Sequence, residues 1–175
     1  MARITIREKA GYLSDAVFAA SDGVVTTFAV VAGSAGASLD QSIVLILGFA
    51  NLFADGFSMA AGNFLGSKSE MEYEKVKGKN TDQQGTPFRH GVVTFIVFNF
   101  AGLLPLLPFL LPVSSPFMLS TILVGVSLFV VGMLRSVYTR KNIFKSGIEM
   151  FAVGGFAAFV AFVVGYLIEN IVVRG

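Results

Sequence analysis

The sequence has no cysteine, no tryptophan and a single histidine among its 175 residues. Without cysteine there are no disulfides, no thiolate metal ligands and no cysteine nucleophile. Charged residues are also scarce, at 14% of the chain, whereas 54% of the residues are hydrophobic. A soluble domain of this length has too little interior to hide so much apolar surface. The composition therefore predicts a protein that is embedded in a lipid bilayer.

Apolar segments of about 20 residues alternate with short charged connections, and that length spans a hydrocarbon layer of about 30 Å. Lipid offers no partners to unpaired backbone groups, so the segments are expected to be helices. We predict an all-α integral membrane protein with one transmembrane domain over residues 1–175. The five predicted spans are 12–34, 42–66, 91–111, 116–135 and 148–172, and the predicted cytoplasmic connection is 67–90.

Two local features refine this plan. Residues 35–41 are too few for anything but a tight antiparallel turn between the first two spans. The third span carries Pro105, Pro108 and Pro112, which predict that its last turns kink or unwind. Pro105 and Pro108, with Gly154 and Gly155 in the fifth span, are candidate flex points for a transport cycle.

Basic residues mark one side of the predicted membrane. Every lysine and arginine except Arg174 lies before the first span, in the 67–90 connection, or where the fourth and fifth spans meet. The positive-inside rule therefore predicts a cytoplasmic N-terminus and a C-terminus outside the cytoplasm. These residues form no coherent patch, so we expect anionic lipid headgroups, and not nucleic acid, as partners. The N-terminal segment lacks the pattern of a cleavable signal.

Charged and polar side chains inside the spans are costly, and they usually line a cavity or pathway. Asp15 and Asp22 are seven residues apart, so they share one helix face about 10 Å apart in depth. Asn51, Asp55 and Met59 share a face of the second span, and antiparallel packing brings Asp55 to the depth of Asp22. Carboxylate, amide and thioether donors suit a divalent transition metal such as Fe(II) or Mn(II). Alternatively, the aspartates bond neighbouring hydroxyls, and Asn51 and Met59 serve helix packing.

Acidic residues in the 67–90 connection form a second candidate site. Glu70 and Glu74 share a helix face and are candidates for capture of cations at the cytoplasmic surface. The alternative is a solvated extension of the second helix. His90 stands at the predicted start of the third helix, where a boundary residue is a simpler interpretation than a ligand.

Small residues predict close packing of the first two spans. Gly62 and Gly66 form a GxxxG pattern, which together with Gly23 permits close helix approach within a protomer or across a dimer. Five helices provide no internal inverted repeat. A two-fold homodimer is therefore the natural way to build a symmetric pathway.

Several stretches resemble the vacuolar iron transporter family. Residues 15–23 (DAVFAASDG) and 26–38 (TTFAVVAGSAGAS) resemble its first helix, and 48–70 (GFANLFADGFSMAAGNFLGSKSE) resembles its second. Segments 103–111 and 124–136 and the glycine-rich final helix match more loosely, so the resemblance covers nearly the whole chain. It implies a dimer of five-helix protomers that moves Fe(II), and often Mn(II), out of the cytoplasm in exchange for protons. By the same resemblance, the ion path runs beside the first helices at the dimer interface.

The resemblance also assigns residues, with two departures. Asp15 and Asp22 match the family's first-helix carboxylates, and Met59 matches its second-helix methionine. Where many members carry a glutamate this chain has Asn51, with Asp55 one turn further on. Plant-type members insert a glutamate-rich, metal-binding hairpin after the second helix, and the 67–90 connection is too short for it.

We therefore predict proton-coupled transport of Fe2+ or Mn2+ out of the cytoplasm, with no enzymatic activity and no cofactor other than the transported ion. Asp15 is assigned to the cytoplasmic entrance, and Asp22 and Asp55 to a central site. One alternative is a passive channel, and another is a non-transporting assembly or regulatory protein that keeps the fold. A third is an intramembrane aspartyl protease that uses Asp22 and Asp55. The short chain without a targeting extension favours a prokaryotic inner membrane, or an organelle membrane if the protein is eukaryotic.

Overall fold

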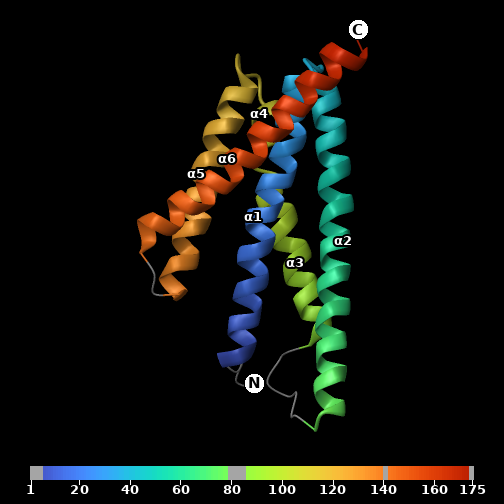
Figure 1. Ribbon diagram of the computed structural model, residues 1–175, viewed down its shortest axis with the longest axis vertical. Helices are drawn as coiled ribbons and strands as arrows, with labels where there is room; N and C mark the ends of the chain where they lie inside the picture. The colour runs from blue at the N-terminus through green and yellow to red at the C-terminus, as the bar shows by residue number, and fades with distance from the viewer. Residues whose placement is uncertain (1–5, 79–85, 140–141, 174–175) are drawn as a thin grey trace.

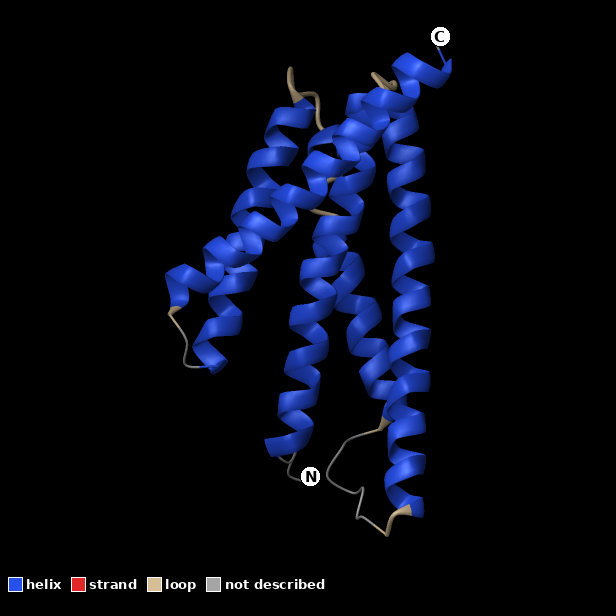
Figure 2. Ribbon diagram, in the orientation of Figure 1, coloured by secondary structure: helices blue, strands red, loops and turns tan. Residues whose placement is uncertain are grey.

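The computed structural model describes residues 6–78, 86–139 and 142–173, and the regular elements in these ranges are all helices (Figure 2). In chain order they are α1 (Ile6–Gly36), α2 (Gln41–Val76), α3 (Pro87–Gly102), α4 (Leu107–Leu110), α5 (Pro116–Thr139), α6 (Ile143–Leu167) and the π-helix η1 (Ile168–Val173). The predicted all-α class is confirmed for this part of the chain.

Four helical segments in the described ranges are long and apolar enough to cross a membrane. They are Glu8–Gly36, Gln41–Val76, Pro116–Ser136 and Ile143–Val173. The predicted third span, 91–111, is not one continuous helix, because α3 ends at Gly102 and the chain turns before the four-residue α4. Pro105 has no N–H to give to a helix and its ring clashes with the preceding turn. The structure thus has the interruption that the prolines predicted in the last turns of this segment.

Neighbouring helices satisfy carbonyl groups that this break leaves without helical partners. The hydroxyl of Ser120 in α5 donates to the carbonyl of Pro105 over 2.7 Å, and both residues are buried. The side chain of Gln41, the first residue of α2, donates through Nε2 to the carbonyl of Phe109 over 2.5 Å. An unpaired carbonyl in lipid would cost several kcal/mol. These two bonds therefore make an interrupted segment compatible with the bilayer.

The connection after α2 is shorter than predicted. Helix α2 does not end near residue 66 but continues for 36 residues to Val76, and α3 begins at Pro87. At about 1.5 Å per residue α2 is about 54 Å long, which exceeds the hydrocarbon thickness. Its last turns carry Lys68, Glu70 and Glu72, all exposed. Residues 67–76 therefore continue the second helix.

Helix α1 is the central element of the bundle (Figure 1). It contacts α2, α3, α5 and α6, while α2 packs on α3, and α5 forms an antiparallel pair with α6. The most apolar stretch of the first helical segment, Glu8–Gly36, is 39% buried inside the protein, whereas that of the last segment, Ile143–Val173, is only 6% buried. The tight turn predicted between the first two helices occupies 37–40. The two ends of the chain lie at opposite ends of the molecule (Figure 1).

Glycines bring α1, α2 and α3 into close contact at mid-height. A Cβ atom at Gly23 of α1 would lie 2.5 Å from the carbonyl oxygen of Phe98 in α3. A Cβ at Gly56 of α2 would lie 2.5 Å from Nδ2 of Asn99, also in α3. Small residues permit such close approach in membranes. Asp22 and Asp55 directly precede two of these glycines, so the same packing fixes the positions of both carboxylates.

Candidate metal and ion pathway

A cavity of about 610 Å³ lies between α1, α2 and α3, on the side of the junction toward the N-terminus. Asp15 lines it from α1, Met59 and Glu70 line it from α2, and His90 lines it from α3. The remaining lining residues are Gly11, Ser14, Phe18, Gly62, Asn63, Gly66, Ser67 and Thr94. Three of the residues that the sequence singled out for metal handling therefore share one space with the only histidine.

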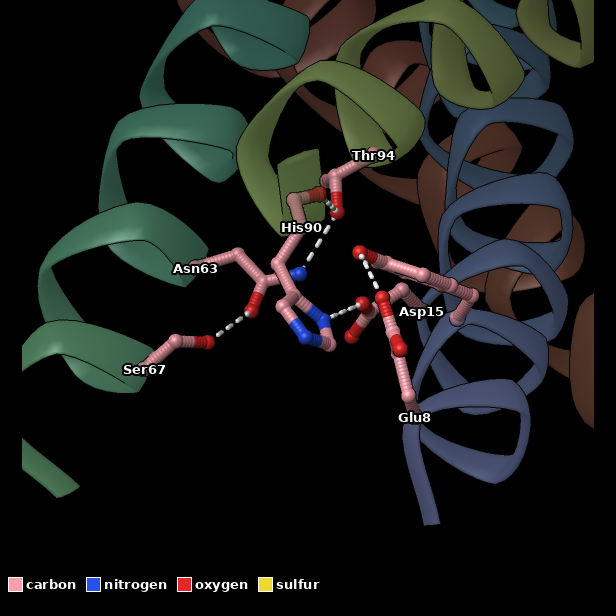
Figure 3. A network of polar contacts seen from close by, with 7 residues as sticks. Glu8, Asp15, Asn63, Ser67, His90 and Thr94 are labelled. Carbon is pink, nitrogen blue, oxygen red and sulfur yellow. Dashed lines mark hydrogen bonds and ion pairs between the residues drawn. The ribbon is translucent and has the colours of Figure 1, made fainter. Parts of the chain in front are cut away.

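Asp15 and His90 are in direct contact across the α1–α3 interface (Figure 3). Oδ2 of Asp15 is in hydrogen-bond contact with Nδ1 of His90, and only 8% of the His90 residue surface is exposed. The imidazole also packs on the ring of Tyr12, with centroids 4.6 Å apart. His90 does lie near the start of α3, but the boundary interpretation missed its contacts. The available signal was its spacing to the buried Thr94 and Phe98, at i+4 and i+8 on the same helix face.

A chain of hydrogen bonds ties this part of α3 to α2 (Figure 3). Thr94 donates to the carbonyl of His90 over 2.9 Å. Nδ2 of Asn63 donates to the Thr94 hydroxyl over 2.6 Å, and Ser67 donates to Oδ1 of Asn63 over 3.4 Å. These side chains hold α2 and α3 in register beside the cavity. The Asp15–His90 contact then joins α1 to the same pair of helices.

Glu8 forms a second polar contact between α1 and α3. Its Oε1 accepts from the Tyr12 hydroxyl over 3.1 Å and lies 3.9 Å from Nη1 of Arg89. Tyr12 thus contacts both Glu8 and the neighbouring imidazole. Because Arg89 is largely exposed, we assign this ion pair little stability.

Asp22 and Asp55 lie further along α1 and α2, away from the N-terminal end of the molecule, than the residues that line the cavity. Asp22 on α1 and Asp55 on α2 directly precede Gly23 and Gly56, which both pack against the Phe98–Asn99 part of α3. Both side chains are half-buried. Seven residues separate Asp15 from Asp22, which is about 10 Å along a helix.

Buried polar atoms without a hydrogen-bond partner occur on all three helices near this level. They are Oγ1 of Thr27 in α1, Nδ2 of Asn51 in α2 and Oδ1 of Asn99 in α3. Such atoms are costly in a low-dielectric interior unless water or an ion reaches them. Asn51 was predicted as a pathway residue, whereas Thr27 and Asn99 were not. Neither of the latter two carries a charge that would have marked it in the sequence.

The other predicted site residues divide between the cavity and the packing. Met59 is half-buried against the core and also lines the cavity. Glu70 lines the cavity mouth, but Glu74 is buried in the same helix, with 8% exposure. The two glutamates therefore do not form an equally exposed pair.

The glycines also differ from one another. Gly23 is buried in the contact with α3 described above, whereas a Cβ at Gly62 or Gly66 would meet no neighbouring element within 4 Å among the described residues. The GxxxG pattern therefore packs against nothing within the described part of the protomer. Its two glycines line the cavity wall and leave the α2 surface open there.

Nowhere in the described residues do three or more His, Cys, Asp or Glu side chains come close enough to hold a metal ion together. The donors occur as pairs at two levels, Asp15 with His90 and Asp22 with Asp55. A pair of protein donors leaves the rest of a metal's coordination to water, to neutral side chains or to another chain.

The long apolar helices define the class as a polytopic helical membrane protein. The chain belongs to the VIT family, whose model matches residues 13–84 and 76–166. The two matched segments meet at the connection between α2 and α3. The resemblance to the vacuolar iron transporter family is therefore confirmed.

Named relatives agree with this membership. A vacuolar iron transporter of Toxoplasma gondii is 27% identical, with 92% of this chain and 76% of the relative covered. Vacuolar iron transporter homolog 1 of Arabidopsis thaliana is 27% identical over 89% of this chain and 82% of the relative. Vacuolar iron transporter 1 of Oryza sativa is 36% identical over 40% of this chain and 28% of the relative. These names are those of transporters, consistent with the prediction that the protein is not an enzyme.

Proposed function

We propose that this protein carries a divalent transition metal, Fe2+ or Mn2+, out of the cytoplasm in exchange for protons. The observation that carries this proposal is the placement of three carboxylates: Asp15 of α1 lines the cavity, and Asp22 of α1 and Asp55 of α2 adjoin the glycines that pack against α3. The relatives' names support iron as cargo, and the oxygen-rich donors with one thioether accept Mn2+ as well.

A metal ion and protons compete for the same carboxylate oxygens, because a carboxylate must lose its proton to bind metal. Arrival of a cation at Asp22 and Asp55 would expel protons, and its departure would allow protons to return. Like charges repel, so neighbouring carboxylates gain most from a shared proton or a shared metal. This competition is a sufficient physical basis for antiport.

We further propose that the working unit is a two-fold homodimer. Its interface lies near the surface of α2 that carries Gly62 and Gly66. Asp22 and Asp55 are only half-buried in a single chain, and a carboxylate exposed to lipid is costly. A second copy that covers Gly62 and Gly66 would shield these groups and supply further donors. In this arrangement the N-terminus and the basic connections face the cytoplasm of a prokaryotic inner membrane or an organelle membrane.

Metal uptake by proteoliposomes, with a pH-sensitive dye trapped inside, tests the proposal. We expect Mn2+ or Fe2+ entry to be coupled to proton exit, and Asp22→Asn to lose most of the flux. Asp40→Asn is the matched control, because Asp40 is exposed in the turn at the far end of the bundle and should transport normally.

Three other outcomes would be informative. Metal flux without proton movement would indicate a passive channel. Normal flux in Asp22→Asn would refute the site assignment. Absence of flux in folded, dimeric protein would favour the non-transporting alternative.

A further inference from the structure

A group of buried polar side chains between α1, α2 and α3 has no explanation in helix packing. It consists of Thr27, Asn51 and Asn99, and we call it the polar cluster. Thr27 is 0% exposed and Asn99 is 9% exposed. Oγ1 of Thr27, Nδ2 of Asn51 and Oδ1 of Asn99 are buried and have no hydrogen-bond partner within the described chain. The group therefore places both donors and acceptors in the protein interior without pairing them.

The hydroxyl of Thr27 differs from those of other threonines in this protein. A threonine within a helix can donate its hydroxyl to the carbonyl four residues earlier. Thr94 donates in this way to His90, and Thr121 to Phe117, each over 2.9 Å. Thr27 lacks such a bond in the part of the chain that the structure describes. A buried polar group without a partner destabilises the conformation that contains it, which points to a second conformation in which water reaches this hydroxyl.

The packing around the polar cluster is tight. A Cβ at Gly102 of α3 would lie 2.9 Å from Oγ1 of Thr27 and 2.5 Å from Cδ1 of Leu52. Asn99 precedes Gly102 by three residues, so the two share one face of α3. Its Nδ2 lies against α2, where a Cβ at Gly56 would be only 2.5 Å away. These approaches leave little room for water or an ion, so the helices are closed here in the present conformation.

Two leucines complete the closure on the side away from the N-terminus. Leu52 and Leu106 are both 0% exposed, and a Cβ at Gly48 of α2 would lie 2.5 Å from Cδ2 of Leu106. Leu106 belongs to the turn between α3 and α4, beside Pro105. Residues in turns and at the ends of helices absorb the backbone changes of hinge motions. This turn can therefore move Leu106 away from α2 while α3 stays in place.

We propose that the polar cluster is the exit half of the ion path, closed by Leu52 and Leu106 in this conformation and hydrated when the turn before α4 moves. This inference rests on the proposed transport function and adds the route by which the cation leaves Asp22 and Asp55. Neutral hydroxyl and amide groups suit an exit, because an ion must bind there weakly enough to leave. The N–H group of Asn51 disfavours direct contact with a cation, so the ion passes this level with its water.

Cysteine accessibility tests the exit directly, because the chain contains no cysteine of its own. Thr27→Cys is reconstituted in vesicles in which its Mn2+ flux is measured, and a small impermeant methanethiosulfonate is applied to the face opposite the N-terminus. We expect its reaction rate to rise several-fold while Mn2+ is transported. Leu128→Cys is the matched control, because Leu128 of α5 is 1% exposed and lies outside the polar cluster; it should stay unreactive. A Thr27→Cys variant that transports Mn2+ but reacts no faster than Leu128→Cys would overturn the proposal.

Thr27→Val provides a second readout, because it keeps the shape of the side chain and removes the hydroxyl. Loss of an unpartnered hydroxyl should raise the midpoint of unfolding, and a less hydrated exit should slow Mn2+ flux. Thr27→Ser keeps the hydroxyl and should restore most of the flux. Thr121→Val removes an exposed hydroxyl on α5 and should leave flux unchanged.

Two results for Thr27→Val would overturn the proposal. Flux equal to that of the wild type would show that the hydroxyl is not part of the path, and a lower midpoint of unfolding would show that it has a partner in the closed conformation. If the wild type carries Mn2+ but Thr27→Cys stays protected, the exit assignment alone fails. If the wild type carries no metal, the proposed transport function itself fails.

Discussion

The glycine contact between α1 and α3 gives the sharpest prediction for stability. Gly23→Ala adds a Cβ 2.5 Å from the carbonyl oxygen of Phe98 and 3.3 Å from the backbone nitrogen of Gly102. Ordinary contacts of a Cβ begin near 3.4 Å, so α1 and α3 must separate by about 0.9 Å. The obstructing atoms belong to the backbone, and no side chain can rotate away to relieve the clash. Overpacking of this kind costs about 1–3 kcal/mol.

Alanine also stabilises a helix by about 1 kcal/mol relative to glycine, so a control variant is needed. Gly155→Ala in α6 provides it, because its Cβ would meet no neighbouring helix within 4 Å in the part of the chain that the structure describes. We expect Gly23→Ala to unfold about 1–3 kcal/mol more easily than Gly155→Ala in mixed-micelle denaturation. Equal unfolding free energies for the two variants would refute the close contact. The clash should also weaken metal flux, because Gly23 adjoins Asp22.

Three further predictions concern the break in the third segment, the orientation and the dimer. Ser120→Ala leaves the buried carbonyl of Pro105 without its donor and should lower the unfolding free energy by about 1–3 kcal/mol. A loss below about 0.5 kcal/mol is typical of a surface substitution. Such a small loss would show that water replaces the hydroxyl. Since the chain has no cysteine, single introduced cysteines report its orientation in the membrane. An impermeant maleimide should label Ser38→Cys but not Ser69→Cys in intact cells. The reverse labelling pattern would show the opposite orientation. Gly66→Cys should form a disulfide between two copies if its α2 surface lies at the dimer interface, and a monomer under oxidising conditions would exclude that surface.

Much of the fold follows from local chemistry that the sequence displays. Long apolar runs must be helical in lipid because no other structure pairs their backbone groups. Pro105 and Pro108 predicted the break after α3, since proline removes a donor and crowds the preceding turn. The same reasoning could not find the exact end of α2, because its charged last turns are as compatible with a solvated helix as with a loop.

Part of the candidate site was also visible in the sequence. Asp15, Asp22 and Asp55 were recognisable because a charge within an apolar run is costly and rare. The spacing of Asp15 and Asp22 followed from helix geometry alone. The contacts of His90 were harder to recognise, because its spacing to Thr94 and Phe98 was the one signal and a histidine near the start of a helix is usually a surface residue.

The sequence by itself determined the class of protein, its helices and the carboxylates that lie within them, because these depend on hydrophobicity, backbone pairing and helical spacing. Only the tertiary structure brought His90 of α3 to Asp15 of α1, 75 residues away, because that contact depends on how two helices pack. It likewise separated Gly23, which is buried in a helix contact, from Gly62 and Gly66, which face open space. A small residue permits close approach, but the presence of a neighbouring helix decides whether that approach occurs.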